Sequence, residues 1–173
     1  MNYQYGLQMF SVRDSAEKDI AETLKAVGKI GYQQIEFAGF FGKNPDEICR
    51  YMEESNVVIS GVHSGWQALA PDVIDDTIAF HRAIGNPNYI IPSAHLETLA
   101  KIDDFVSVIN PAQEKLAKNG INLTFHNHGI EFITQYWGTN MMTELEKRTD
   151  LMFEIDPYWA FNVGVDPIAL CER

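Results

Sequence analysis

The sequence has few cysteines and little basic charge, and each shortage argues against a class of protein. Cys49 and Cys171 are the two cysteines of the chain, and no CxxC pair occurs, so neither a disulfide scaffold nor a zinc knuckle is indicated. Lysine and arginine number 13 against 24 aspartates and glutamates, which gives a net charge of −11. Such a chain repels phosphate backbones and anionic lipids, and its basic residues form no local cluster. We therefore expect no nucleic-acid partner.

Long apolar runs are also missing. No stretch approaches the roughly 18 apolar residues that a membrane-spanning helix needs, so we expect no membrane partner. The N-terminal stretch MNYQYGLQMFSVRD lacks the basic segment and apolar run of a signal peptide. We expect a cytoplasmic location, with a leader already removed as the alternative. Hydrophobic residues make up 46% of the 173 residues, which favours one globular domain with a sizeable core.

Short β-like runs alternate with amphipathic segments along the whole chain. Strand candidates recur at roughly 30-residue intervals, the size of a βα unit: YGLQMFSV, QQIEFAGF, VVISGVHS, NYIIPSAH, INLTFHNH and LMFEID. A helix is expected over NPDEICRYMEESN, with Asn44 as N-cap and Pro45 at its first position. This alternation predicts a parallel sheet covered by helices. It fits either an open doubly wound sheet or a (β/α) barrel that lacks its last two units.

Polar side chains lie near the ends of three strand candidates, all on one phase of each strand. The opposite phase is apolar and suits contact with helices. The polar phase carries these residues: Glu36, His126, His128, Glu154 and Asp156. Doubly wound sheets bury both faces, so a polar phase favours a barrel with a site at its mouth. Charges that point into a barrel are costly unless they are paired or bind a metal, and mixed Asp, Glu and His ligands suit manganese, zinc or cobalt best.

Five stretches together resemble the sugar phosphate isomerase/epimerase family, of xylose isomerase-like TIM-barrel fold: GLQMFSVRD, IGYQQIEFAGF, VHSGWQAL, FHNHGIEF and FEIDPYWAFNVGVDP. The resemblance runs from about Tyr5 to Arg173. It implies a TIM-barrel-type parallel barrel with about six of the eight βα units. It also implies a single domain over residues 1–173, C-terminally truncated relative to the family. Endonuclease IV shares the superfamily, but its DNA-facing surface needs basic character that a net charge of −11 does not suggest.

The resemblance implies one divalent metal, either Mn, Co, Zn or Mg, held at the strand ends. Asp156 matches the strand-six ligand of the family. The strand-five ligand is normally a glutamate, but here His126 stands at the strand end and Glu131 follows five residues later. Glu131 is expected as metal ligand and catalytic group, with His126 as the alternative ligand. His126 and His128 are expected as catalytic or substrate-binding groups, and the family's seventh-strand histidine and eighth-strand glutamate have no counterpart.

Further residues are expected to contact the substrate: Glu36, His63, Trp66 and Trp159. An inward carboxylate needs a partner, which favours a site role for Glu36. His63 fits either a substrate contact or a polar residue of the barrel rim. The two tryptophans fit either a sugar-stacking wall or packing under loops. Glu154 fits either the site or an internal salt bridge, for example with Arg13.

The resemblance implies a sugar, sugar-phosphate or keto-sugar isomerase or epimerase that works through a metal-stabilised ene-diolate. Some relatives instead dehydrate or cleave keto-sugars, also through an ene-diolate. The alternative is a non-catalytic truncated barrel. Its first and last strands would have unpaired edges, so it would form a homo-oligomer through them and bind a sugar without converting it. A DNA-repair nuclease is a third option, which the acidic charge disfavours.

Overall fold

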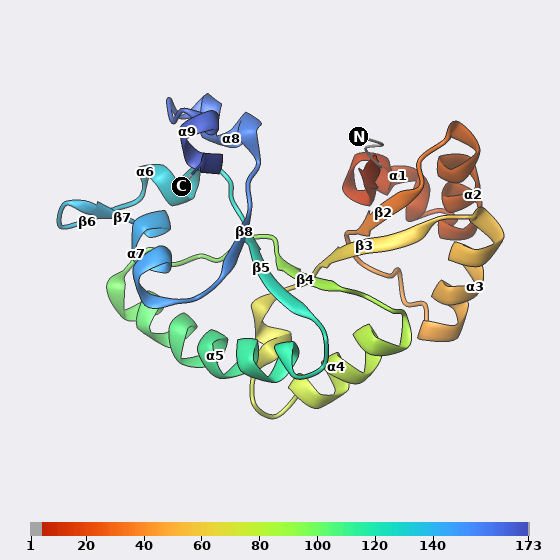
Figure 1. Cartoon of the computed structure of the whole chain (residues 1–173), viewed down its shortest axis with the longest axis horizontal. Helices are drawn as coiled ribbons and strands as arrows, with labels where there is room; N and C mark the ends of the chain where they lie inside the picture. Colours follow the sequence, from red (N-terminus) through yellow and green to blue (C-terminus); the bar gives the residue numbers. More distant parts are fainter. Residues whose placement is uncertain (1–4, 173) are drawn as a thin grey trace.

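The computed structural model describes residues 5–172, which form one curled parallel sheet with helices outside it (Figure 1). The sheet order is β1-β2-β3-β4-β5-β8, and every pair is parallel. The strands are β1 (Gly6–Gln8), β2 (Gln34–Phe37), β3 (Val58–His63), β4 (Asn88–Ile91), β5 (Asn122–His126) and β8 (Met152–Glu154). Spatial order follows chain order, whereas a doubly wound sheet reverses its order at a switch point. The barrel-type fold is confirmed, and the doubly wound alternative is wrong.

The expected domain, residues 1–173, extends past the described range at both ends. Residues 1–4 and Arg173 lie outside the described residues. Within the described range, no helix has the length and apolarity needed to cross a lipid bilayer.

Helices cover the convex side of the sheet (Figure 1). They are α2 (Ile20–Ile30), α3 (Pro45–Ser55), α4 (Ile74–Ala83), α5 (Leu99–Ala117) and α7 (Met141–Arg148). Short elements complete the chain: η1 (Met9–Val12), α1 (Arg13–Ala16), η2 (Trp66–Leu69), α6 (Ile130–Ile133), the hairpin β6 (Gln135–Tyr136) and β7 (Thr139–Asn140), α8 (Pro157–Asn162) and α9 (Pro167–Glu172). The predicted N-cap Asn44 is confirmed, and the structure adds a reciprocal capping box between Asn44 and Glu47.

The apolar phase of the strands faces the helices. Leu123 and Phe125 of β5 are buried, and the Phe125 ring lies edge-on to Phe105 of α5, with 6.2 Å between centroids. On β2, Ile35 and Phe37 are fully buried in the same way. Because side chains alternate along a strand, this packing turns the polar phase toward the inside of the curled sheet. The predicted strand polarity is confirmed for β2 and β5.

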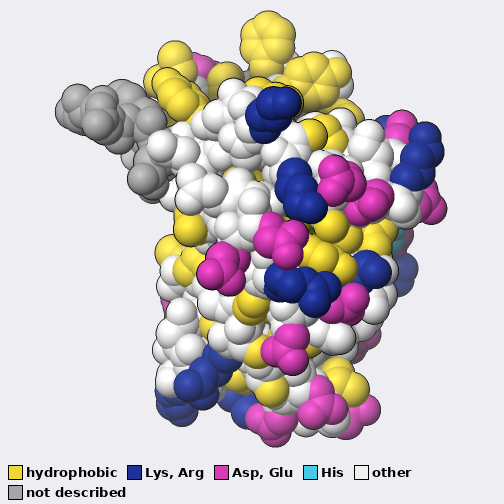
Figure 2. Space-filling view, turned by 90° about the vertical axis from the view of Figure 1, so that its right-hand side faces the viewer, with side chains coloured by type: hydrophobic (Ala, Val, Ile, Leu, Met, Phe, Trp, Pro, Cys, Tyr) yellow, Lys and Arg dark blue, Asp and Glu magenta, His cyan; other side chains and the backbone are white. Residues whose placement is uncertain are grey.

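Charges of both signs are mixed on the face that carries α2 and α3 (Figure 2). Lys25 of α2 lies 3.0 Å from Glu22 and 3.6 Å from Glu54 of α3. These exposed pairs contribute little to stability, but they divide the face into small patches of opposite sign.

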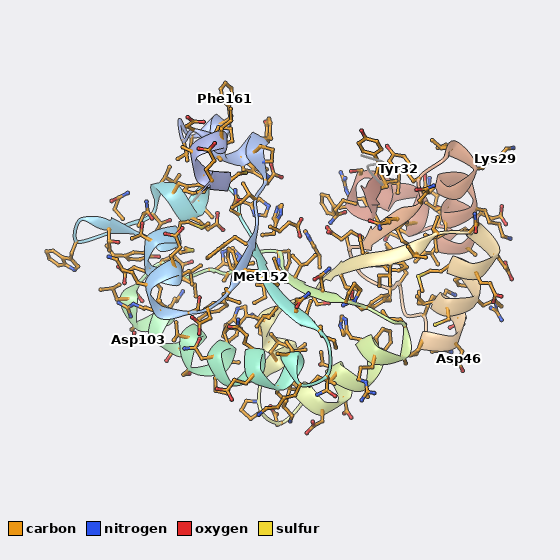
Figure 3. All side chains as sticks on the ribbon, in the orientation of Figure 1. Lys29, Tyr32, Asp46, Asp103, Met152 and Phe161 are labelled. Carbon is orange, nitrogen blue, oxygen red and sulfur yellow. The ribbon has the colours of Figure 1, made fainter. Side chains whose placement is uncertain are left out.

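The last strand of the sheet, β8, leaves one edge open among the described residues. Met152, near the middle of Figure 3, lies on this strand and is 48% exposed. An apolar groove of about 440 Å³ lies beside β8, and its walls include Met142, Phe153, Ile155 and Leu170. Apolar side chains that would be buried in a closed core are therefore partly exposed on this side of the molecule.

Candidate functional site

A cavity of about 490 Å³ opens at the carboxyl ends of the strands, where parallel barrels carry their sites. The residues that line it include Gln8, His63, His126, His128, Asp156 and Trp159. They come from β1, β3, β5 and the segments that follow β5 and β8. The sequence predicted that His63, His126, His128 and Asp156 belong to the site, and all four line this cavity. Trp159 lines it too, although the sequence was equally consistent with a sugar-stacking role and with packing under a loop.

Carboxylates and imidazoles alternate across the inside of the sheet. Glu36 Oε1 of β2 lies 2.9 Å from His63 Nε2. His63 Nε2 is 3.7 Å from Glu154 Oε1, which in turn is 3.4 Å from His126 Nδ1. His126 Nε2 then lies 3.9 Å from Asp156 Oδ2. Five side chains from β2, β3, β5 and the β8 end thus form one continuous polar chain.

The charges of this chain shift the pKa values of its members. Burial by itself lowers the pKa of His63, but contacts with Glu154 and Glu36 outweigh burial and raise this pKa to about 9. Burial likewise raises the pKa of Glu154, yet His126 and His63 outweigh it and lower this pKa to about 2. In the absence of a cation, His63 therefore carries a proton at neutral pH and Glu154 is ionised.

Several buried atoms of the chain lack a hydrogen-bond partner among the described residues. They are Glu36 Oε1, His63 Nε2 and His126 Nδ1. The 2.9 Å approach of Glu36 to His63 brings opposite charges together without the alignment that a hydrogen bond requires. Buried polar atoms without such partners are uncommon and call for an explanation.

A divalent cation supplies such an explanation, and the residues fit one. His63, His126 and Glu154 each offer one ligand atom, and these atoms all lie within 4.8 Å of one another. Two imidazole nitrogens with one carboxylate are a donor set that zinc, manganese and cobalt accept. Glu154 therefore faces the site. The alternative role for Glu154, a salt bridge to Arg13, is not found, because the Arg13 guanidinium lies over the Phe10 ring, 4.3 Å from its centroid.

Asp156 lies at the cavity with its two oxygens in different roles. Oδ1 accepts hydrogen bonds from the backbone N–H groups of Tyr158 and Trp159 and so caps the start of α8. Oδ2 faces His126. Because Oδ1 caps α8, Oδ2 is left on the side of the cavity, 3.9 Å from His126 Nε2.

Asn127 connects the ends of β5 and β8. It is fully buried, its Oδ1 accepts from the Asp156 N–H at 2.8 Å, and its Nδ2 donates to the Asp156 carbonyl at 3.3 Å. This pair of bonds holds Asp156 beside His126. Sequence reasoning assigned no role to Asn127, although an asparagine between two inward histidines was a signal in the stretch FHNH.

Glu131 lies behind the cavity wall. It is fully buried in α6, and its Oε2 accepts a hydrogen bond from the His128 N–H at 2.7 Å. Its Oε1 has no hydrogen-bond partner among the described residues, and burial raises the pKa of Glu131. Of the two residues expected as strand-five ligand, the fold brings His126 into the cluster and places Glu131 outside it.

Aromatic rings form one wall of the cavity. The His128 ring lies 5.2 Å from Trp159 and 4.9 Å from His126, measured between centroids. Burial and the neighbouring His126 lower the pKa of His128, so it is neutral at pH 7. Trp66 does not line this cavity but packs edge-on against Phe105 at 5.5 Å. Trp159 is thus available to stack on a ligand, whereas Trp66 belongs to the packing.

The sequence and the structure of the chain were compared with those of known proteins. No protein-family model matches the sequence, and no curated protein does. A sugar phosphate isomerase/epimerase from Parabacteroides distasonis aligns with a TM-score of 0.81 and 24% identity, over 96% of this chain and 70% of that one. The chain has the xylose isomerase-like TIM-barrel fold. The resemblance drawn from the five sequence stretches is confirmed at the level of this fold.

Two further solved structures share this xylose isomerase-like fold. A D-psicose 3-epimerase, solved in the presence of D-fructose, aligns with a TM-score of 0.62 and 10% identity over 94% of this chain and 66% of that one. A xylose isomerase-like TIM barrel protein from Mycobacterium smegmatis, solved in complex with magnesium, aligns with a TM-score of 0.58 and 12% identity. It covers 90% of this chain and 64% of that one. The chain thus spans about two thirds of the length of these proteins.

Proposed function

We propose that this chain provides the metal-binding half of a sugar isomerase or epimerase site. The observation that carries the proposal is the convergence of His63, His126 and Glu154 at the mouth of a barrel of this fold. Among the described residues, His63 Nε2 and His126 Nδ1 are buried there without a hydrogen-bond partner. Sugar isomerases and epimerases are among the proteins that share the fold.

In this proposal His63, His126 and Glu154 hold the cation. When bound, the cation polarises a sugar carbonyl and the hydroxyl beside it. Gln8 orients His63 through Nδ1, at 3.2 Å from Gln8 Nε2, whereas Glu36 Oε1 lies 2.9 Å from Nε2, the nitrogen that faces Glu154, and would therefore lie beside the cation. The contact with Gln8 fixes the ring that must present its nitrogen to the cavity.

Two residues at the cavity are placed to move protons. Asp156 was expected as a metal ligand, but the group of candidate ligands does not include it. In this proposal Asp156 instead directs Oδ2 into the cavity and acts as the base that removes a proton from the carbon beside the carbonyl. Neutral His128 is positioned to exchange a proton with a sugar oxygen. Glu131 holds the His128 backbone, and Trp159 stacks on the sugar. Glu131 thereby acts through His128 in place of its expected role as ligand.

Metal-linked stability tests this proposal. Thermal unfolding is measured with Mn²⁺, Co²⁺, Zn²⁺ and Mg²⁺, and we expect stabilisation of about 2.7 kcal/mol once the free metal reaches roughly 100 times Kd. His126→Ala and Glu154→Gln should each abolish the effect, while His95→Ala, a change at an exposed histidine outside the cluster, should retain it. Incorporation of solvent deuterium into a panel of free sugars then measures proton abstraction. Equal metal response in all four proteins would refute the assigned ligands.

A second candidate function rests on the open edge of β8. An exposed strand edge beside an apolar groove is a template for association, so the alternative is a homo-oligomer that binds sugar without converting it. Size-exclusion mass with Met152→Lys as the edge variant tests it. A wild-type oligomer that the variant converts to monomer would support this function, and a wild-type monomer would contradict it.

A further inference from the structure

A second chamber of about 430 Å³ lies next to the main cavity. It sits between the loop that follows β4 and helix α6. Ser93 and His128 line both chambers, so the two are neighbours that meet at the His128 ring. The ring itself is anchored on one side, through contact with Trp159 and through the Glu131 bond to its backbone. The two spaces are therefore adjacent and share the wall that His128 and Ser93 form.

The chemistry of the two chambers differs. The main cavity is lined by His63, His126, His128 and Asp156 beside Trp159. The second chamber has an apolar wall of Ala94, Leu96 and Met141, which are buried, and Ile130, which is 49% exposed. Its remaining lining residues are Ser93, His95, Glu97, His128 and Thr134. A free sugar presents hydroxyls on every side and gains little from such walls. An apolar group gains free energy there in proportion to the apolar area that it buries.

Charge narrows the ligand further. Among the described residues, neither chamber is lined by lysine or arginine. Glu97 lines the second chamber, and Asp156 lines the first. In the second chamber a phosphate or carboxylate would meet Glu97 and no lining lysine or arginine, so the substituent that fits there is uncharged.

We infer that the two chambers bind one ligand, a neutral sugar that carries an uncharged apolar substituent. The sugar lies in the main cavity, and the substituent passes His128 and rests on Ile130, Leu96 and Met141. Each chamber is near the lower end of the roughly 300–1,000 Å³ of ordinary ligand sites, and together they suit a two-part ligand. This inference rests on the proposed function, because it assigns the sugar to the same cavity.

Matched probes test the inference. Phenyl and methyl glycosides of the same hexoses are titrated into the Mn²⁺-loaded chain by calorimetry. We expect at least one phenyl glycoside to bind about tenfold more tightly than its methyl counterpart, because the ring buries apolar area in the second chamber. Ile130→Asn should remove most of this preference and leave methyl glycoside binding unchanged. Ile133→Asn is the matched control, since Ile133 lies on the same helix, is 57% exposed and lines neither chamber.

The outcomes separate this inference from the proposed function. Equal affinity for phenyl and methyl glycosides, or equal effects of the two asparagine variants, would overturn the inference while metal-linked stabilisation and methyl glycoside binding remain. If no glycoside binds while metal still stabilises the chain, the inference also falls. Loss of the metal response itself refutes the proposed function.

Discussion

Replacing Asn127 by alanine removes the link between the ends of β5 and β8. Both hydrogen bonds of the Asn127 amide go to the backbone of Asp156, at 2.8 and 3.3 Å, and the side chain is fully buried. The Asp156 carbonyl also accepts from the Ala160 N–H at 3.2 Å and keeps that partner in the variant. The variant therefore leaves the Asp156 N–H without its partner and removes one of the two hydrogen bonds to the Asp156 carbonyl.

The magnitude follows from these two bonds. Each contributes about 1 kcal/mol, and a buried polar group left unsatisfied costs about 1–3 kcal/mol. Asp156 is only half-buried, so water satisfies part of the loss. We expect Asn127→Ala to lower the free energy of unfolding by about 2–4 kcal/mol. The cap on α8 through Asp156 Oδ1 should loosen with it, which weakens the metal-linked stabilisation as well.

Urea unfolding followed by circular dichroism measures this change. Asn110→Ala is the matched control, because Asn110 also donates to a backbone carbonyl, that of Arg148, but from an exposed position. Its cost should stay below about 1 kcal/mol. Asn127→Asp keeps the acceptor for the Asp156 N–H, but its ionised form opposes the Asp156 carbonyl. Its deficit relative to wild type should therefore shrink as the pH falls and the new carboxyl becomes a donor. An Asn127→Ala cost within 0.5 kcal/mol of that of Asn110→Ala would refute the assigned role.

Two further predictions follow from the charges. Burial lowers the pKa of His81 to about 4, so its neutral form contributes stability that is complete above about pH 6.5 and is lost as the pH falls through 4. Wild type should lose up to about 3 kcal/mol relative to His81→Gln between pH 7 and pH 4 in urea unfolding, and a constant difference would contradict this. The net charge of −11 predicts no binding to abasic-site duplex DNA at low salt, measured by fluorescence anisotropy, and saturable binding would contradict it.

Much of the fold could be predicted from the sequence because the relevant forces are local. Alternating apolar residues such as Leu123 and Phe125 identify which face of a strand meets the helices, and Asn44 with Pro45 marks the start of α3. The polar phase of β5 and β8 follows directly from that alternation. It is enough to place His126 and Asp156 at one rim.

The composition of the cluster depended on the tertiary structure. In sheet order, β3 and β8 are separated by β4 and β5, which in a flat sheet would put them about 14 Å apart at the usual strand spacing. Curling of the sheet instead brings His63 Nε2 within 3.7 Å of Glu154 Oε1. The role of Glu131 was hidden for a related reason, since the turn into α6 buries it behind His128. Local spacing along the chain thus determines which side of a strand a residue occupies, whereas the curvature of the whole sheet determines which residues on that side meet.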